Sequence, residues 1–240
     1  MPFLSINDYH NACERQVEQD NADGVECVYL PNTVINEKPK YCLIGAEPSC
    51  SRGGVAGMRT LIGQGTTNFL TSHGDFILQM CAYEYLCGNS YGYILTDLSK
   101  GAMPTRQARI DRFARYAQWP PILEDELHFY GDPIRIAVGK DAEDFLAMNG
   151  IDVAVRVLHY STQNGIRFRK YFNDHPENQH LTDNLYQRLK TFVEFTFEMI
   201  DYPEVLRANR LNALFPHNRK ELNIDNRGMY LHYRDKFLGL

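Results

Sequence analysis

Short apolar stretches alternate along this chain with longer segments in which apolar residues recur at helical spacing. The short stretches occupy residues 40–49, 91–101, 133–142 and 152–162, and each ends in a polar or glycine-containing turn. The helical patterns occupy residues 74–87, 106–119 and 141–150. Short apolar runs bounded by turn residues predict strands, and a spacing of three to four residues predicts helices.

This alternation of strand and helix predicts an α/β fold. We expect a central, mainly parallel sheet of four strands with helices on both faces. A further amphipathic pattern over residues 181–201 predicts a long helix, which belongs to a helical C-terminal appendage over about residues 180–240. The 240 residues suit a single domain, with a motif-bearing core over about residues 40–172.

Composition narrows the class of protein. Hydrophobic residues make up 44% of the chain and charged residues 23%, which is ordinary for a globular protein. The net charge of −5 argues against a protein that coats nucleic acid, although an enzyme that meets DNA briefly needs only a local basic face. The N-terminal residues have mixed charge without an apolar core, and no apolar run approaches the roughly 20 residues of a membrane span. We therefore expect no membrane association.

The six cysteines predict neither a metal site nor a disulfide framework. They form no Cys-x-x-Cys pair, and no set of Cys and His has the spacing of a zinc site. Cys42 lies within a predicted strand, where we expect a buried, reduced thiol. Reduced cysteines predict a cytoplasmic protein. We also expect the protein to be a monomer and to need no cofactor.

Polar residues follow the predicted strands, at the edge where open α/β sheets bind ligands. The four strand tips read GAEPS (45–49), TDLSKG (96–101), GKDAE (139–143) and HYSTQNG (159–165). Glu47 in the first tip would orient or polarise a water molecule, and Asp97 in the second would hydrogen-bond a substrate. His159 in the fourth would stabilise negative charge on a leaving group. Titratable groups that converge in one cleft are what a catalytic site requires.

Each of these three residues also has a structural interpretation. Glu47 would cap the segment that follows it. Asp97 would close an Asp-Leu-Ser turn, and His159 would be a hydrogen-bonded structural histidine. The functional interpretation therefore depends on all three residues following strands in one pattern.

In their order, the tips resemble the motifs of the uracil-DNA glycosylase superfamily. Gly-x-Glu-Pro-Ser, Thr-Asp-Leu-Ser-Lys-Gly, Val-Gly-Lys-x-Ala and His-Tyr-Ser follow one another within residues 40–172. The resemblance implies hydrolysis of the N-glycosidic bond of a nucleotide flipped out of DNA, without a metal. It implies that Glu47 positions the water and stabilises an oxocarbenium-like sugar, and that His159 hydrogen-bonds O2 of the departing base. It also implies an aromatic stacking platform, for which Phe69 is our candidate; the alternative for Phe69 is a core position.

Asp97 departs from the family pattern, which has Asn at this place. An Asn amide reads uracil by accepting from N3–H and donating to O4, whereas an ionised Asp accepts but cannot donate. Carboxylates accept well from the amino group of cytosine. We therefore expect the substrate to be a base with a donor at this position, such as a modified cytosine, in repair or phage defence. A protonated Asp97 and an alignment shifted by one residue are the alternatives.

The segment QNGIRFRKYF follows the fourth motif, in which Tyr160 stands where the family has Pro. The resemblance implies that this segment binds DNA. Arg167 and Arg169 would contact phosphates, and Ile166 or Phe168 would fill the gap left by the flipped base. The alternative is a solvated basic turn with two core anchors. Further expected DNA contacts are Arg52, Lys100 and Ser161.

Four arginines recur at intervals of three along the predicted helix 106–119, at positions 106, 109, 112 and 115. Such spacing places them on one drifting stripe, which either faces solvent or faces DNA.

Two other functions fit the same strand tips. One is an α/β enzyme that acts on a nucleotide or small metabolite, and the other is a glycosylase-like module that binds DNA or a protein without catalysis. The chain has no Gly-x-Gly-x-x-G or phosphate-loop signature that would favour a dinucleotide or a triphosphate.

Overall fold

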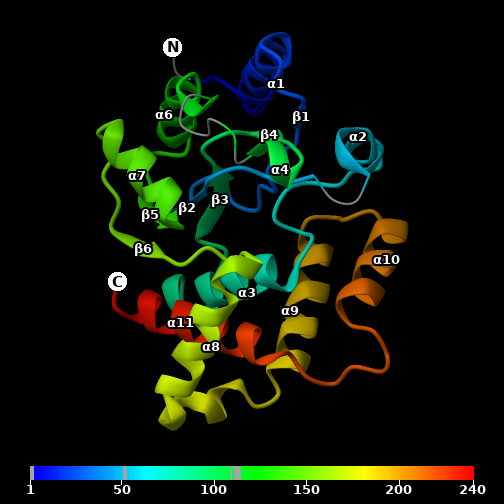
Figure 1. Ribbon diagram of the computed structural model, residues 1–240, viewed down its shortest axis with the longest axis vertical. Coiled ribbons are helices and arrows are strands. Elements are labelled where there is room, and N and C mark those ends of the chain that lie inside the picture. Colours follow the sequence, from blue (N-terminus) through cyan, green and yellow to red (C-terminus); the bar gives the residue numbers. More distant parts are fainter. Residues whose placement is uncertain (1–2, 51–52, 109, 111–114) are drawn as a thin grey trace. The chain divides into compact units, whose positions relative to one another are not determined.

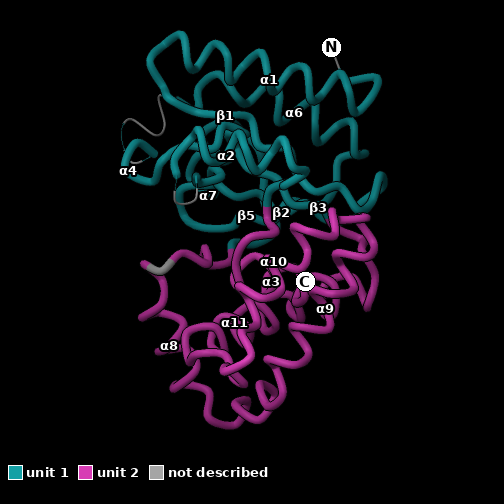
Figure 2. Tube along the Cα trace, turned by 90° about the vertical axis from the view of Figure 1, so that its right-hand side faces the viewer, with its two compact units in different colours: residues 1–68, 94–156 teal, residues 69–93, 157–240 magenta. Residues whose placement is uncertain are grey.

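The chain folds into two compact units, shown in a computed structural model that describes residues 3–50, 53–108, 110 and 115–240 (Figures 1 and 2). Unit 1 comprises residues 1–68 and 94–156, and unit 2 comprises residues 69–93 and 157–240. The division differs from the predicted layout of a 40–172 core with an appendage, because residues 69–93 leave that core and join the C-terminal residues.

A four-stranded parallel sheet flanked by helices gives the chain its α/β class, as predicted. Its strand order is β3 (Tyr93–Asp97), β2 (Tyr41–Gly45), β5 (Ile134–Val138) and β6 (Val155–Val157). β2 pairs in parallel with β5, with Tyr41 opposite Ile134 and Ile44 opposite Ala137. All five residues of β2 are buried, which explains why its sequence is apolar throughout instead of alternating. The four predicted strands are therefore confirmed.

Unit 1 also contains a small sheet and several helices, of which α6 and α7 pack against the large sheet. The small sheet pairs β1 (Val28–Tyr29) with β4 (Gly101–Ala102) in antiparallel fashion. The helices are α1 (Ile6–Ala22), α2 (Gly54–Gly63), α4 (Thr105–Ala108), α6 (Pro120–Phe129) and α7 (Lys140–Met148). α7 confirms the helix predicted at 141–150. α4 covers only the first residues of the helix predicted at 106–119, and Ile110, the next described residue, is a bend. Residues 109 and 111–114 of that prediction lie outside the described residues.

One hydrophobic core of unit 1 lies between the sheet and helices α6 and α7, and a second packs α1 against β1 and Trp119. In the first core, Cys42 and Ile44 of β2 pack with Leu127 of α6 and Phe145 of α7. Cys42 is completely buried, is not in a disulfide, and burial raises the pKa of its thiol. The predicted buried thiol is therefore confirmed.

Unit 2 is built from helices around α11. Its elements are α3 (His73–Cys81), the π-helical turn η1 (Ala82–Leu86), η2 (Thr162–Asn164), α8 (Gly165–Asp174), η3 (Pro176–Thr182), α9 (Leu185–Met199), α10 (Glu204–Leu214) and α11 (Ile224–Leu238). α3 begins with a capping box between Ser72 and Asp75. α11 packs on α8, α3 and η1. The C-terminal residues are helical as predicted, but they supply the centre of unit 2 and are not an appendage.

Candidate functional site

The tips of β2 and β3 lie side by side in unit 1. The backbone N–H of Leu98 donates to the carbonyl of Gly45 at 3.0 Å, and that of Ser99 donates to Ala46 at 3.1 Å. These bonds continue the pairing beyond the strand ends, so Glu47 and Asp97 stand on adjoining turns. They also show that the turn N–H groups of Leu98 and Ser99 bond to backbone carbonyls, which argues against Asp97 as a turn-closing residue.

Glu47 is a nearly buried carboxylate held by two donors. Its side chain is 5% exposed, and Oε2 accepts from the Tyr116 hydroxyl at 2.5 Å and from Nη2 of Arg115 at 3.3 Å. Arg115 is itself fixed, since its Nη2 donates to the carbonyl of Ala108 at 2.6 Å. Helix α2 begins later in the chain, with Gly53 as its N-cap, so Glu47 does not cap it. The carboxylate is therefore held stiffly at the strand tip.

Asp97 ends β3 and is 3% exposed. Its Oδ2 accepts from Nδ2 of Asn68 at 2.7 Å. Its Oδ1 lies over Gly45, where a Cβ atom would overlap it. Gly45 in the GAEPS tip is therefore needed for Asp97 to adopt this position, because any side chain there would displace the carboxylate.

Lys100 is buried in an ion pair and does not face solvent. Its side chain is 1% exposed and its ammonium pairs with Oε2 of Glu126 at 2.8 Å, so the prediction that Lys100 contacts a phosphate is wrong. The same ammonium donates to Thr96 Oγ1 at 2.5 Å and to the carbonyl of Asp97. Lysine is rarely buried unless it is paired, and here the carboxylate of α6 supplies the pairing.

His159 belongs to unit 2 and has a defined tautomer. The backbone N–H of Ser161 donates to its Nδ1 at 3.0 Å. Because Nδ1 is the acceptor, the neutral ring carries its proton on Nε2 and donates there. Nδ2 of Asn164 donates to the His159 carbonyl at 2.8 Å, and the ring stacks on Tyr160 with 4.6 Å between centroids. The ring is thus oriented by its own loop.

The backbone of the residue before His159, Leu158, is hydrogen-bonded to two side chains of α11. Tyr233 donates its hydroxyl to the carbonyl of Leu158 at 2.7 Å, and the N–H of Leu158 donates to Nε2 of His232 at 3.2 Å. Burial lowers the pKa of His232 to about 4. Tyr160 packs against Gly74 at the start of α3, where a Cβ would come within 2.8 Å of its ring. The backbone on both sides of His159 is therefore anchored.

The structure separates the expected DNA-binding residues into exposed and buried ones. Ile166 is 79% exposed at the start of α8, and Arg167 is exposed beside it. Phe168 is fully buried against Tyr233, so its predicted role in filling the base gap is wrong and it is a core anchor. Arg169 is exposed but forms two hydrogen bonds with Asp225, at 3.0 and 3.2 Å. Ser161 is half-buried.

Phe69 and Arg52 complete the predicted set. Phe69 opens unit 2 with a left-handed backbone (φ 62°), and its carbonyl accepts from Nε2 of Gln79 at 2.7 Å. Its ring is buried, which fits the alternative of a core position better than an open stacking platform. Arg52 lies outside the described residues.

The sequence does not predict four residues that hold the strand-tip side chains. Asn68 binds Asp97, Tyr116 binds Glu47, Glu126 pairs with Lys100, and Asn32 donates from Nδ2 to Oγ1 of Thr96 at 2.9 Å. Asn68 stands directly before Phe69 in GTTNFL, and a polar residue beside the stacking candidate was the available signal. Arg115 was assigned to a stripe facing solvent or DNA, whereas it binds Glu47. The partners of Glu47, Asp97 and Lys100 come from other segments of the chain, and local pattern does not reveal such pairs.

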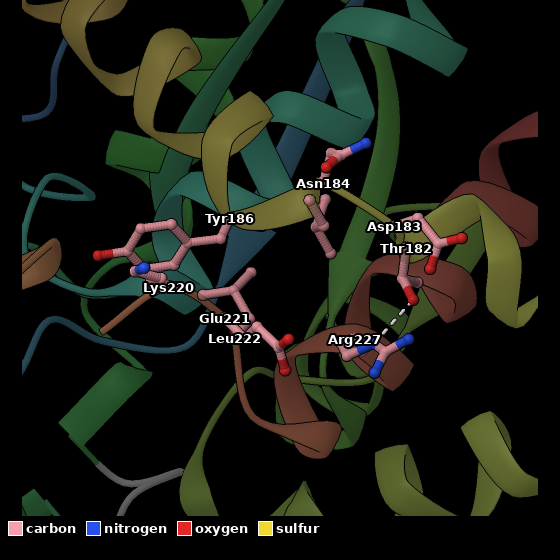
Figure 3. Close-up of a pocket in the computed structure, with 9 residues that line it drawn as sticks. Thr182, Asp183, Asn184, Tyr186, Lys220, Glu221, Leu222 and Arg227 are labelled. Carbon is pink, nitrogen blue, oxygen red and sulfur yellow. Dashed lines mark hydrogen bonds between the residues drawn. The ribbon is translucent and has the colours of Figure 1, made fainter. Parts of the chain in front are cut away.

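A cavity of about 320 Å³ lies within unit 2 (Figure 3). The first residues of α9, the loop before α11 and α11 itself line it, and its charged side chains are Asp183, Lys220, Glu221 and Arg227. Nε of Arg227 donates to Thr182 Oγ1 at 2.8 Å, as the dashed line marks. The lining carries two cations and two carboxylates and includes none of the strand-tip residues.

Within the described part of the chain, no group of three or more His, Cys, Asp or Glu side chains could hold a metal ion. The same residues contain no helix that is long and apolar enough to cross a membrane. No protein-family model matches the sequence, and a search of curated proteins found no match.

Proposed function

We propose that the protein is a DNA base glycosylase of the uracil-DNA glycosylase type, acting on a base that carries an amino group, such as a modified cytosine. The observation that carries the proposal is the carboxylate of Asp97 at the end of β3, accepting a hydrogen bond on Oδ2 and adjoining the Glu47 tip. The four-stranded parallel sheet flanked by helices is consistent with a fold of this type. Because Asp97 is nearly buried, a base reaches it only when the residues that cover it move aside.

In the proposed reaction, water adds to C1′ of the sugar as the bond from C1′ to the base nitrogen breaks. The electron pair of that bond leaves with the base, and the proton of the water passes to the departing base or to solvent. Glu47, held by Arg115 and Tyr116, orients the water and stabilises the positive charge that develops on the sugar. A carboxylate fixed beforehand needs no reorganisation when that charge appears.

His159 would stabilise the leaving base. The Ser161 N–H on Nδ1 supports a neutral ring that donates from Nε2. Such a donor is suited to an oxygen of the base that becomes negative as the glycosidic bond breaks. Ile166, exposed at the start of α8, would occupy the gap in the duplex, and Arg167 would contact a phosphate.

The test is an abasic-site assay. Purified protein is incubated with labelled oligonucleotides that contain uracil, hypoxanthine, cytosine, 5-hydroxymethylcytosine or glucosylated 5-hydroxymethylcytosine, and the strands are then cleaved with hot alkali. We expect breaks at a cytosine derivative. Breaks at uracil alone would refute the assignment of Asp97, and the absence of breaks at every base would refute the glycosylase.

Glu47→Gln tests the mechanism. We expect the excision rate to fall by about 10²- to 10³-fold while DNA binding is retained, because an oriented electrostatic contact to the transition state is lost. Glu143→Gln is the matched control, since Glu143 also pairs with an arginine, Arg156 at 3.0 Å, but on the exposed surface. An unchanged rate in Glu47→Gln would remove Glu47 from the mechanism. A protein that only binds DNA would release no base in the wild type or either variant.

A further inference from the structure

We propose that Asn68 is a positioning residue that fixes how the Asp97 carboxylate meets a base. Its amide is the last link of a hydrogen-bond relay that begins at the buried ion pair between Lys100 and Glu126. The relay determines which oxygen of Asp97 accepts a hydrogen bond, and thereby favours a base with an amino donor. The inference rests on the proposed function and names the residues that set its base preference.

The direction of the relay is set at the ion pair. A lysine ammonium has donors and no acceptor, so every atom that it contacts must accept. Oγ1 of Thr96 lies 2.5 Å from the Lys100 ammonium and therefore accepts there. Its single proton goes to the carboxylate of Glu126, whose oxygens are 2.9 and 3.0 Å away. Thr96 can then only accept from any further partner.

Asn32 is the next link. Its Nδ2 lies 2.9 Å from Thr96 Oγ1 and 3.2 Å from the hydroxyl of Tyr9. Tyr9 donates its own proton to Glu126; burial, followed by the charge of Glu126, raises the pKa of Tyr9, so the hydroxyl stays protonated. Both oxygens near Asn32 are therefore acceptors toward it. Its amide nitrogen must face them, which turns its Oδ1 toward Asn68.

The orientation of the Asn32 amide determines the orientation of the Asn68 amide, which contacts Asp97. Its Nδ2 lies 3.4 Å from Oδ1 of Asn32 and 2.7 Å from Oδ2 of Asp97. With Asn32 presenting an oxygen, the nitrogen of the Asn68 amide must point to both partners, and its two hydrogens serve one each. Oδ2 of Asp97 is thereby fixed as an acceptor. Because the unprotonated oxygen of a carboxyl group is the better acceptor, this bond disfavours a proton on Oδ2 and directs any proton to Oδ1, which is packed over Gly45.

Asn68→Asp tests the relay, because it replaces the donor with a carboxylate of nearly the same shape. Two carboxylates this close repel each other when both are ionised, so at neutral pH they share a proton and Asp97 gains donor character. We expect the ratio of excision rates, amino-bearing base over uracil, to fall at least about tenfold at neutral pH and to recover as the shared proton is lost at higher pH. Asn149→Asp, on the exposed end of α7 in the same unit, is the matched control and should leave the ratio unchanged.

A structural role alone predicts a different result. In that case Asn68→Asp would slow both excisions equally, with an unchanged ratio and pH profile, and the proposal would be overturned. If Asn68→Asp does not fold, Asn68→Ala serves instead: it removes the donor without adding a charge, and we expect a lower ratio without the new pH dependence. An unchanged ratio in folded Asn68→Ala would equally overturn the proposal.

A double-mutant cycle separates failure of the relay from failure of the proposed function. Asn68→Ala, Asp97→Ala and the double variant are unfolded with urea, and their unfolding constants are compared with the wild type. A hydrogen bond to a charged group predicts a coupling of at least about tenfold. Coupling below about twofold would refute the relay even in an active enzyme. Strong coupling in a wild-type protein that excises no base would refute the proposed function, and the base preference with it, while the relay would stand as an orienting device.

Discussion

Replacing Lys100 with methionine removes one partner of a buried ion pair and leaves the other in place. The Lys100 and Glu126 side chains are 1% and 2% exposed, so Glu126 would keep its hydrogen bonds from Thr96 and Tyr9 but lose its compensating charge. Removing one member of a buried pair typically costs about 3–5 kcal/mol. For a chain of this length each kcal/mol lowers the melting temperature by about 2–4 °C, so we expect a loss of roughly 10 °C.

Lys140→Met is the matched control for this measurement. Lys140 also pairs with a carboxylate, Asp144 at 2.7 Å, but its side chain is 69% exposed. Surface pairs one helical turn apart contribute only about 0.3–0.5 kcal/mol. Thermal and urea denaturation of both variants would compare them directly. If Lys100→Met cost less than about 1 kcal/mol, or no more than Lys140→Met, the reasoning from burial would be refuted.

Two further predictions concern unit 2. Gly228→Ala in α11 should destabilise the protein by about 1–3 kcal/mol in urea denaturation, because the new Cβ would overlap the carbonyl oxygen of Phe168. Gly63→Ala, at an open position that ends α2, should be neutral or stabilising, and equal effects of the two would contradict the close approach of α8 and α11. His232 has a folded-state pKa of about 4, below its usual 6.5, so the unfolded chain binds the proton first and stability is lost as pH falls from about 6.5 to 4, by about 3 kcal/mol. His232→Gln should flatten this part of the pH–stability curve, and an unchanged curve would show that the ring is not desolvated.

The strands and several helices could be predicted because the signals that encode them are local. β2, β3, β5 and β6 each come from a short apolar run that ends in a turn, and α7 and α9 come from apolar residues at helical spacing. α11 was harder to predict, since it is buried on several sides and its apolar residues form no single stripe. The segment that forms α8 is predicted as a DNA-binding segment, because its basic residues stand next to two apolar residues that suit insertion into DNA. The structure shows a helix there, with Phe168 buried.

For the strand tips, the local sequence pattern predicts where the polar residues lie but not which side chains they contact. The sequence by itself determined that Glu47 and Asp97 each follow a strand of one parallel sheet and therefore lie along the same edge. The order of the strands, with β3 beside β2, comes from the tertiary structure. Only the tertiary structure decided that Glu47 is held by Arg115 and Tyr116, that Asp97 accepts from Asn68, and that Lys100 is buried. Secondary structure depends on neighbours a few residues apart, whereas a buried charge or amide is satisfied by whichever partner the packing brings to it, from any distance along the chain.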